Sequence, residues 1–254
     1  MASCGWHLIA HNLHGIIGSG ISAHLASWDF QDDFTTDTWT DYGTGFGVSS
    51  GAMQWNTATG SGSWKDLLGY AINNTAFVLR QAITIANHSS PANEQPMFML
   101  TDTSGTITEG VQYDYLAIQA QTIATKWVSW HGNNAILSSA DPQTTFTSHT
   151  IAVGTSYLEM IRLSSTALQV TFYSNSGYSS IIQRLTETIS SGFTNLRYGR
   201  FHSRLGAGGV INGTVDTYRL ANGVTVAPWT FHYLINQGNM NNPVMVNLLG
   251  CQMI

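Results

Sequence analysis

Apolar and polar residues alternate along much of this chain, and a period of two residues is that of a β-strand with one buried face. The clearest case is a pair of segments, Tyr157–Leu163 and Ala167–Tyr173, separated by a short Ser/Thr turn. In the second segment every other residue from Leu168 to Phe172 is apolar. The pair therefore predicts a β-hairpin.

Further segments of the same character follow one another, with turn residues about every 10 to 15 positions. Strands are expected at residues 46–48, 52–55, 77–85, 97–100, 112–119, 125–131, 181–188, 195–201 and 213–220. The sequence has no amphipathic helix of four turns and no internal repeat. This organisation predicts an all-β sandwich over residues 28–227, with an N-terminal arm at 1–27 and a C-terminal tail at 228–254.

The stretch Ile211–Gly223 near the end of the predicted domain combines three signals. It is rich in strand-forming residues, it finishes at the turn dipeptide Asn222-Gly223, and it places one carboxylate, Asp216, in the strand centre. An unpaired charge there would be unfavourable if buried. The strand resembles the closing strand of concanavalin A-like sandwiches, and the run Asp33–Asp41 resembles the Asp-Asp-Phe…Trp opening of laminin-G-like members.

The resemblance spans about residues 30–225 and extends to legume-type lectins and family-16 glucanases. It implies a concanavalin A-like jelly roll of two antiparallel sheets, in which the last strand lies beside the first. In those folds the closing-strand Asp often helps to hold a structural calcium ion. Carried to this chain, the Ca²⁺ ligands would be Asp216, Asp33 and Gly51, with Asp32 as a spare. Otherwise, Asp216 pairs with an arginine or caps a turn.

The acidic residues argue against hydrolysis of sugars. Family-16 glucanases carry Glu-x-Asp-x-(x)-Glu on one strand, which aligns the catalytic carboxylates on one face. The chain has four glutamates, and none stands in such a motif: Glu94, Glu109, Glu159 and Glu187. A Gly-x-Ser-x-Gly elbow and a His-Glu-x-x-His motif are also missing. We therefore expect no enzymatic activity.

Glycan binding is the usual work of sandwiches of this kind, because sugar faces stack on aromatic rings and sugar hydroxyls meet amide groups. One run combines both residue types where a predicted strand ends in a polar loop. Its candidate glycan-binding residues are Trp127, Trp130, His131, Asn133 and Asn134. Two strand residues three positions apart face opposite ways, so the alternative is that the tryptophans belong to the core or to a subunit contact.

The composition points to a location outside the cytosol. Charged residues make up 9% of the 254 residues, against roughly 25% in an average soluble domain. The net charge is −5 and no basic run is present, so nucleic-acid binding is not expected. No apolar stretch is long enough to span a membrane. The segment Leu8–Ala26 lacks a basic start and is interrupted by histidines, so we interpret it as a retained arm of an extracellular or virion-surface protein.

The N-terminal arm carries residues with two interpretations each. His7, His11 and His14 are spaced to share one helical face, so they are either ligands of a transition metal or polar residues of an interfacial arm. Cys4 and Cys251 stand at opposite ends of the chain and are either separate thiols or a disulfide.

The leading functional hypothesis is a non-enzymatic structural protein that forms a homo-oligomer, virion or filament through its terminal arms. The apolar ending Pro243–Ile254 either docks into a neighbouring subunit or packs on its own domain. A virion surface, fibre or decoration protein, or an extracellular filament subunit, would fit this description. The alternative is a secreted carbohydrate-binding lectin module, and the third hypothesis is a degenerate glycoside hydrolase.

Overall fold

The computed structural model describes residues 28–56, 60–88, 95–108, 111–121, 126–136, 143–204 and 211–225. Within these ranges, all regular secondary structure is β-strand. The strands are β1 (Phe30–Asp32), β2 (Thr40–Tyr42), β3 (Phe46–Ser49), β4 (Ala52–Trp55), β5 (Gly62–Asp66), β6 (Phe77–His88), β7 (Gln95–Thr101), β8 (Gln112–Gln121), β9 (Lys126–Ile136), β10 (Gln143–Thr150), β11 (Gly154–Ser164), β12 (Ala167–Tyr173), β13 (Ile181–Thr188), β14 (Tyr198–Arg204) and β15 (Ile211–Asn222). Within this part of the chain, no helix has the length and apolar character needed to cross a membrane.

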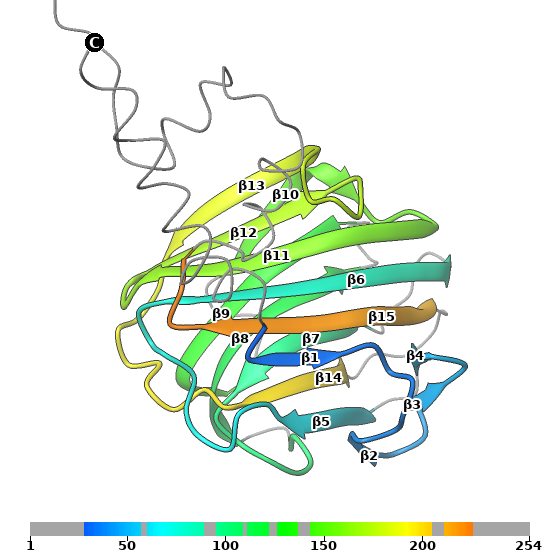
Figure 1. Cartoon of the computed structure of the whole chain (residues 1–254), viewed down its shortest axis with the longest axis horizontal. Coiled ribbons are helices and arrows are strands. Elements are labelled where there is room, and N and C mark those ends of the chain that lie inside the picture. Colours follow the sequence, from blue (N-terminus) through cyan, green and yellow to red (C-terminus); the bar gives the residue numbers. More distant parts are fainter. Residues whose placement is uncertain are drawn as a thin grey trace, which may run out of the picture. The chain divides into compact units, whose positions relative to one another are not determined.

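The strands form two antiparallel sheets that face each other (Figure 1). The first sheet has the order β13-β12-β11-β6-β15-β4-β3, with β1 also paired to β15. The second sheet has the order β10-β9-β8-β7-β14-β5-β2. The prediction of an all-β sandwich of two antiparallel sheets is therefore confirmed. Asp29–Thr225 forms one compact unit, and the predictions for His7, His11, His14, Cys4, Cys251 and the apolar tail lie outside the described residues.

The predicted hairpin is present as β11 and β12, paired from Tyr157 opposite Tyr173 to Ser164 opposite Ala167. Alternation decides which side chains enter the core. Leu168, Val170 and Phe172 are fully buried and belong to the main hydrophobic cluster. Burying such side chains between two sheets stabilises the fold by about 1.5–3 kcal/mol each.

The first and last strands meet as the resemblance implied. Phe30 of β1 lies opposite Leu220 of β15 in an antiparallel pair. At the end of β1, Asp32 accepts hydrogen bonds from the indole Nε1 of Trp39 at 2.9 Å and from the backbone N–H of Phe34 at 2.7 Å. Trp39 then stacks on Phe201 with 4.7 Å between ring centroids. The Asp-Asp-Phe…Trp opening is therefore a structural device that ties a turn to the core.

One acid is buried between the sheets. Glu187 of β13 is 8% exposed, and its Oε2 accepts a hydrogen bond from the hydroxyl of Ser129 at 2.8 Å. Burial raises the pKa of the Glu187 carboxyl, because the charged form loses hydration. The folded state therefore binds this proton more tightly than the unfolded state does.

The raised pKa of Glu187 predicts a stability that depends on pH. Because the folded pKa lies above the unfolded value, the wild type loses stability as pH rises through that interval. Glu187→Gln removes the charge and is expected to raise the melting temperature at pH 7 by a few degrees. Thermal melts at pH 3.5 and pH 7 measure this. A variant that is equally stabilised at both pH values would contradict the ionisation argument.

Candidate functional site

The predicted metal ligands lie along one edge of β15. That edge pairs first with β1, which ends at Asp32 opposite Tyr218, and then with β4, where Met53 lies opposite Val215. Asp216 lies between these two paired stretches. Asp33 follows β1 directly, and Gly51 precedes β4 in a turn with φ +74°. The fold therefore brings the three predicted positions to the same region of the first sheet.

Asp216 occupies a β-bulge. Val215 lies opposite Ile83 and Thr217 lies opposite Ala82, so Asp216 is an extra residue on β15 relative to β6. Its side chain is half-buried on the outer face of the sheet. The carboxylate Oδ1 accepts a hydrogen bond from the Thr214 hydroxyl at 2.7 Å, and Oδ2 accepts one from the Thr84 hydroxyl at 3.1 Å. Two threonine hydroxyls are therefore the observed hydrogen-bond partners of the Asp216 carboxylate, for which the sequence predicted a metal ion, an arginine or a turn.

The Asp33 carboxylate is exposed and bonded within its own turn. Its Oδ1 accepts hydrogen bonds from the Thr35 hydroxyl at 2.9 Å and from the Thr35 backbone N–H at 3.2 Å. These bonds hold the pKa of Asp33 below its usual value, since they favour the charged form.

Throughout the described ranges, no three His, Cys, Asp or Glu side chains gather as a metal-binding group. Any Ca²⁺ ion here would have to rely on Asp216 and on backbone carbonyl oxygens, a hard-oxygen set of the type that calcium accepts.

The two predicted tryptophans face opposite sides of the second sheet, as their spacing predicts. Trp127 points into the main core, where its ring centroid lies 5.0 Å from that of Phe172. Trp130 belongs to a second cluster on the outer face of this sheet. The other members of that cluster are Met97, Met99, Ile107, Tyr113, Tyr115, Ala117 and Val128. Both indoles are 1% exposed, so the structure offers no sugar-stacking platform at either position.

The three polar residues after Trp130 have structural partners. Asp114 of β8 accepts hydrogen bonds from the Asn133 side-chain amide at 2.9 Å and from the Asn134 backbone N–H at 2.7 Å. Asn134 has φ +48°, and the register of β8 and β9 shifts at this point. The His131 ring lies edge-on to Phe193, and burial lowers its pKa. These residues form an irregular strand end.

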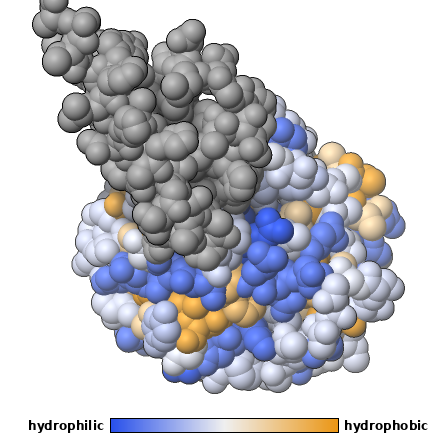
Figure 2. All heavy atoms as spheres, in the orientation of Figure 1, coloured by the Kyte–Doolittle hydropathy of each residue, from blue (hydrophilic) through white to orange (hydrophobic). Residues whose placement is uncertain are grey.

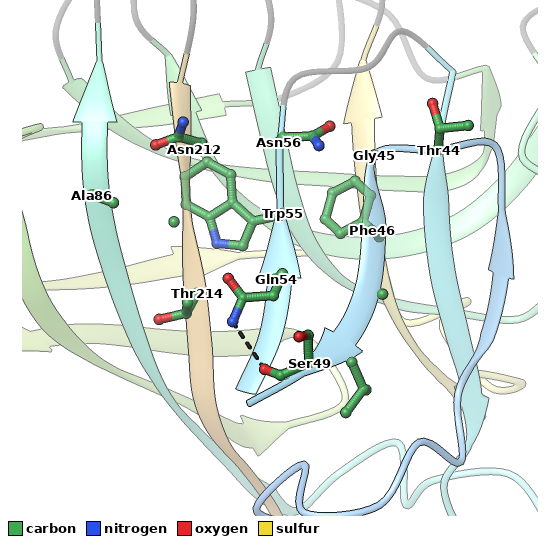
Figure 3. A pocket seen from close by; sticks show the side chains of 13 residues that line it. Thr44, Gly45, Phe46, Ser49, Gln54, Trp55, Asn56, Ala86, Asn212 and Thr214 are labelled. Atoms are coloured by element: carbon green, nitrogen blue, oxygen red, sulfur yellow. Dashed lines mark hydrogen bonds between the residues drawn. The ribbon is translucent and has the colours of Figure 1, made fainter. Parts of the chain in front are cut away.

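A groove of about 540 Å³ crosses β3, β4, β15 and β6 (Figure 3). Figure 3 shows Asn212 and Thr214 on β15, Gln54 on β4 and Asn56 directly after β4. The lining residues are Thr44, Gly45, Phe46, Gly47, Val48, Ser49, Gln54, Trp55, Asn56, Ala86, Asn212, Gly213 and Thr214. None of them is charged. Gln54 is held by a hydrogen bond from its Nε2 to the Ser49 carbonyl oxygen at 3.0 Å.

The polar members of this groove lie on the outer face of the first sheet, since they alternate with buried residues. Gln54 lies between buried Met53 and Trp55, and Thr214 lies between buried Gly213 and Val215. Figure 2, in the same orientation as Figure 1, shows hydrophilic and hydrophobic residues mixed over the visible part of the sandwich. Sequence analysis did not predict the groove. Alternation marked its polar positions as outward-facing, but they come from segments far apart in the chain.

No protein-family description and no curated protein sequence matches the chain. Its structure is similar to the VIP36 exoplasmic/lumenal domain in a Ca²⁺/Man3GlcNAc-bound form, with TM-score 0.53 and 9% identity over 76% of this chain and 88% of that one. It is also similar to lectin II from Ulex europaeus, with TM-score 0.51 and 12% identity over 77% and 99%. A third similar structure comes from work on endo-acting O-glycanases of the human gut microbiota, with TM-score 0.53 and 10% identity over 77% and 99%. The chain thus has the concanavalin A-like lectin fold.

Proposed function

We propose that this chain is a non-catalytic carbohydrate-binding protein that holds its ligand in the groove across β3, β4, β15 and β6. The observation that carries the proposal is the groove's lining, which combines amide and hydroxyl side chains with no charged group. Asn and Gln amides both donate and accept hydrogen bonds, as sugar hydroxyls do. The lining also includes the apolar residues Phe46, Val48 and Ala86. A mixed lining of this kind suits an uncharged sugar, which presents both hydroxyl groups and apolar ring faces.

The acidic residues near the groove support binding without hydrolysis. A retaining glycosidase needs two carboxyl groups about 5–5.5 Å apart on either side of the sugar bond. No lining residue is Asp or Glu. Asp216, bonded to the lining residue Thr214, is a single carboxylate with both oxygens engaged by hydroxyls. A degenerate glycoside hydrolase therefore stays the third candidate.

The structural neighbours favour the same proposal. The VIP36 domain is described with Man3GlcNAc bound, and the Ulex europaeus protein is a lectin. By this analogy we propose glycans as the ligands of the present chain and a location outside the cytosol. The exoplasmic/lumenal description of the VIP36 domain and the low charge of this chain support that location.

The test of the proposal is a glycan array followed by calorimetric titration of the best neutral oligosaccharide. Replacing both Asn56 and Asn212 with alanine removes two side-chain amides from the groove. We expect Kd to rise at least about tenfold, because each lost hydrogen bond contributes about 1 kcal/mol. Ser104→Ala in an exposed loop is the control and should leave Kd unchanged. Equal affinity in the double variant, or no glycan bound by the wild type, would refute the proposal.

Calcium is a second proposal for the same sheet. The Asp216 carboxylate and the carbonyl oxygens of Asp33 and Gly51 would hold the ion, which would supply a structural link between the end of β1 and the start of β4. The VIP36 domain is described in a Ca²⁺-bound form, which supports calcium by analogy.

Thermal melting with and without chelator tests the calcium proposal. With Ca²⁺ at 100 times its Kd, binding adds about 2.7 kcal/mol to the free energy of unfolding, so the melting temperature should rise and fall back in EDTA. Asp216→Asn should show no response to Ca²⁺. Superimposable wild-type melting curves in Ca²⁺ and EDTA would rule the ion out.

Assembly into a virion, fibre or filament stays a prediction from the sequence, as does the homo-oligomer. It depends on the N-terminal arm and the C-terminal tail, and residues 1–27 and 226–254 lie outside the part of the chain that the structure describes. Glycan binding by the sandwich and assembly by the arms are compatible activities of one protein.

A further inference from the structure

We infer that Asp216 makes the groove selective for uncharged glycans and excludes acidic ones. This inference rests on the proposed function and specifies its ligand class. It starts from a row of polar residues on the outer face of the first sheet. Gln54, Thr214, Thr84 and Thr155 lie opposite one another across β4, β15, β6 and β11. The row begins at the groove-lining residues Gln54 and Thr214 and continues past them to Thr84 of β6 and Thr155 of β11.

The hydrogen-bond directions in this row are determined by Asp216. A carboxylate only accepts hydrogen bonds, so the hydroxyls of Thr84 and Thr214 must each donate their single hydrogen to it. The Thr84 hydroxyl also lies 2.7 Å from that of Thr155. Since Thr84 has no second hydrogen, Thr155 is the donor in that pair. One carboxylate thereby orients three hydroxyl groups.

A ligand that binds this row must supply the hydrogen-bond donors. With their hydrogens used inside the row, the three threonine oxygens present only lone pairs to a ligand: Thr214 to a molecule in the groove, and Thr84 and Thr155 to one that continues along the row beyond the groove. The hydroxyl groups of a neutral sugar can donate to these oxygens. A carboxylate or sulfate group on a sugar has no hydrogen to donate and would place lone pairs against lone pairs. The row therefore matches uncharged hydroxyls and mismatches anions.

The negative charge of Asp216 also disfavours an anionic ligand. The hydroxyl oxygen of the lining residue Thr214 is 2.7 Å from the Asp216 carboxylate, so an anion touching that oxygen would lie about 5–6 Å from a negative charge. None of the groove-lining residues is a lysine or arginine that would compensate. Repulsion at that distance near a protein surface weakens binding by about tenfold or more.

The test measures Kd in EDTA for one oligosaccharide in three forms: neutral, with a terminal uronic acid, and with a terminal sulfate. Wild type should bind the neutral form at least about tenfold more tightly than either acidic form. Asp216→Asn should bring this ratio close to one, since the charge is gone and the amide can donate to a threonine oxygen, which frees that hydroxyl hydrogen for an anion. Thr84→Val, which keeps the charge and removes one oriented hydroxyl, should lower the ratio partly. Asp37→Asn, at an exposed carboxylate outside the row, is the control and should leave the ratio unchanged.

A neutral-to-acidic ratio that is the same in wild type and Asp216→Asn would overturn the inference while neutral binding in the groove stands. Equal wild-type affinity for all three forms would overturn it as well. If the wild type binds none of the three forms, or if the Asn56/Asn212 double alanine variant binds all three as wild type does, the proposed function itself fails and the inference falls with it. Circular dichroism melts confirm that each variant is folded before its ratio is compared.

Discussion

Replacing Glu159 with alanine is expected to lower the free energy of unfolding by about 3–5 kcal/mol. Glu159 of β11 lies directly opposite Arg80 of β6, and their side chains are 4% and 3% exposed. The Glu159 Oε2 accepts a hydrogen bond from Arg80 Nε at 2.6 Å, and Oε1 accepts one from the Tyr173 hydroxyl at 2.7 Å. The variant would leave a buried guanidinium without its carboxylate.

Urea denaturation measures the Glu159 effect, and two comparisons interpret it. The ion pair between Arg197 and Asp66 is about one-third exposed, so Asp66→Ala should change stability much less. Replacing both partners of the buried pair, as Arg80→Met with Glu159→Leu, should recover most of the loss, because no uncompensated charge remains. A Glu159→Ala variant no less stable than Asp66→Ala would contradict the assigned role.

Gly213→Ala is expected to destabilise the first sheet by about 3 kcal/mol or more. A Cβ at Gly213 would lie 1.8 Å from the backbone oxygen of Thr84 and 2.7 Å from Cζ2 of Trp55. Neither atom can yield easily, since one belongs to the backbone of β6 and the other to a ring that is 2% exposed. Moving β6 would also shift the Thr84 hydroxyl away from Asp216.

The Gly213 prediction is checked by urea denaturation, with Gly177→Ala as the matched control. A Cβ at Gly177 would meet its nearest neighbour, the side-chain nitrogen of Asn175, at an ordinary 3.5 Å. The control should therefore change stability by no more than about 0.5 kcal/mol. If Gly213→Ala is as stable as Gly177→Ala, then β15 is less tightly packed against β6 than the structure indicates.

Sequence patterns predicted the fold where alternation was strong. The β11–β12 hairpin follows from apolar residues at every second position, whereas the pairing of β15 with β1 was implied only by the resemblance to concanavalin A-like sandwiches. Strand β10 (Gln143–Thr150) was not predicted, because Phe146 is its single buried residue and the others are polar. The short strands β2 and β5 were missed for a similar reason: each exposes or half-exposes most of its side chains.

The candidate site was predictable only in part. The resemblance suggested Asp216, Asp33 and Gly51, and strand register places the end of β1 and the start of β4 along the same edge of β15. The role of these residues as calcium ligands stays a prediction. The glycan-binding prediction at Trp127 and Trp130 relied on residue type, which cannot tell a buried indole from an exposed one. The groove escaped prediction because its residues meet only through non-local strand pairing. Such pairing depends on the register of whole strands, which no local pattern specifies.

The position of β15 in the first sheet has a consequence for biosynthesis. β15 lies between β6 on one side and β1 and β4 on the other, so within that sheet it is the only described link between the chain's earliest strands and the rest. A ribosome must therefore translate as far as Asn222 before the sheet can close. Until then one edge of β6 has no partner, and unpaired edges of nascent chains invite aggregation or chaperone binding. Fragments of the chain that end before Asn222 should accordingly be insoluble or chaperone-bound.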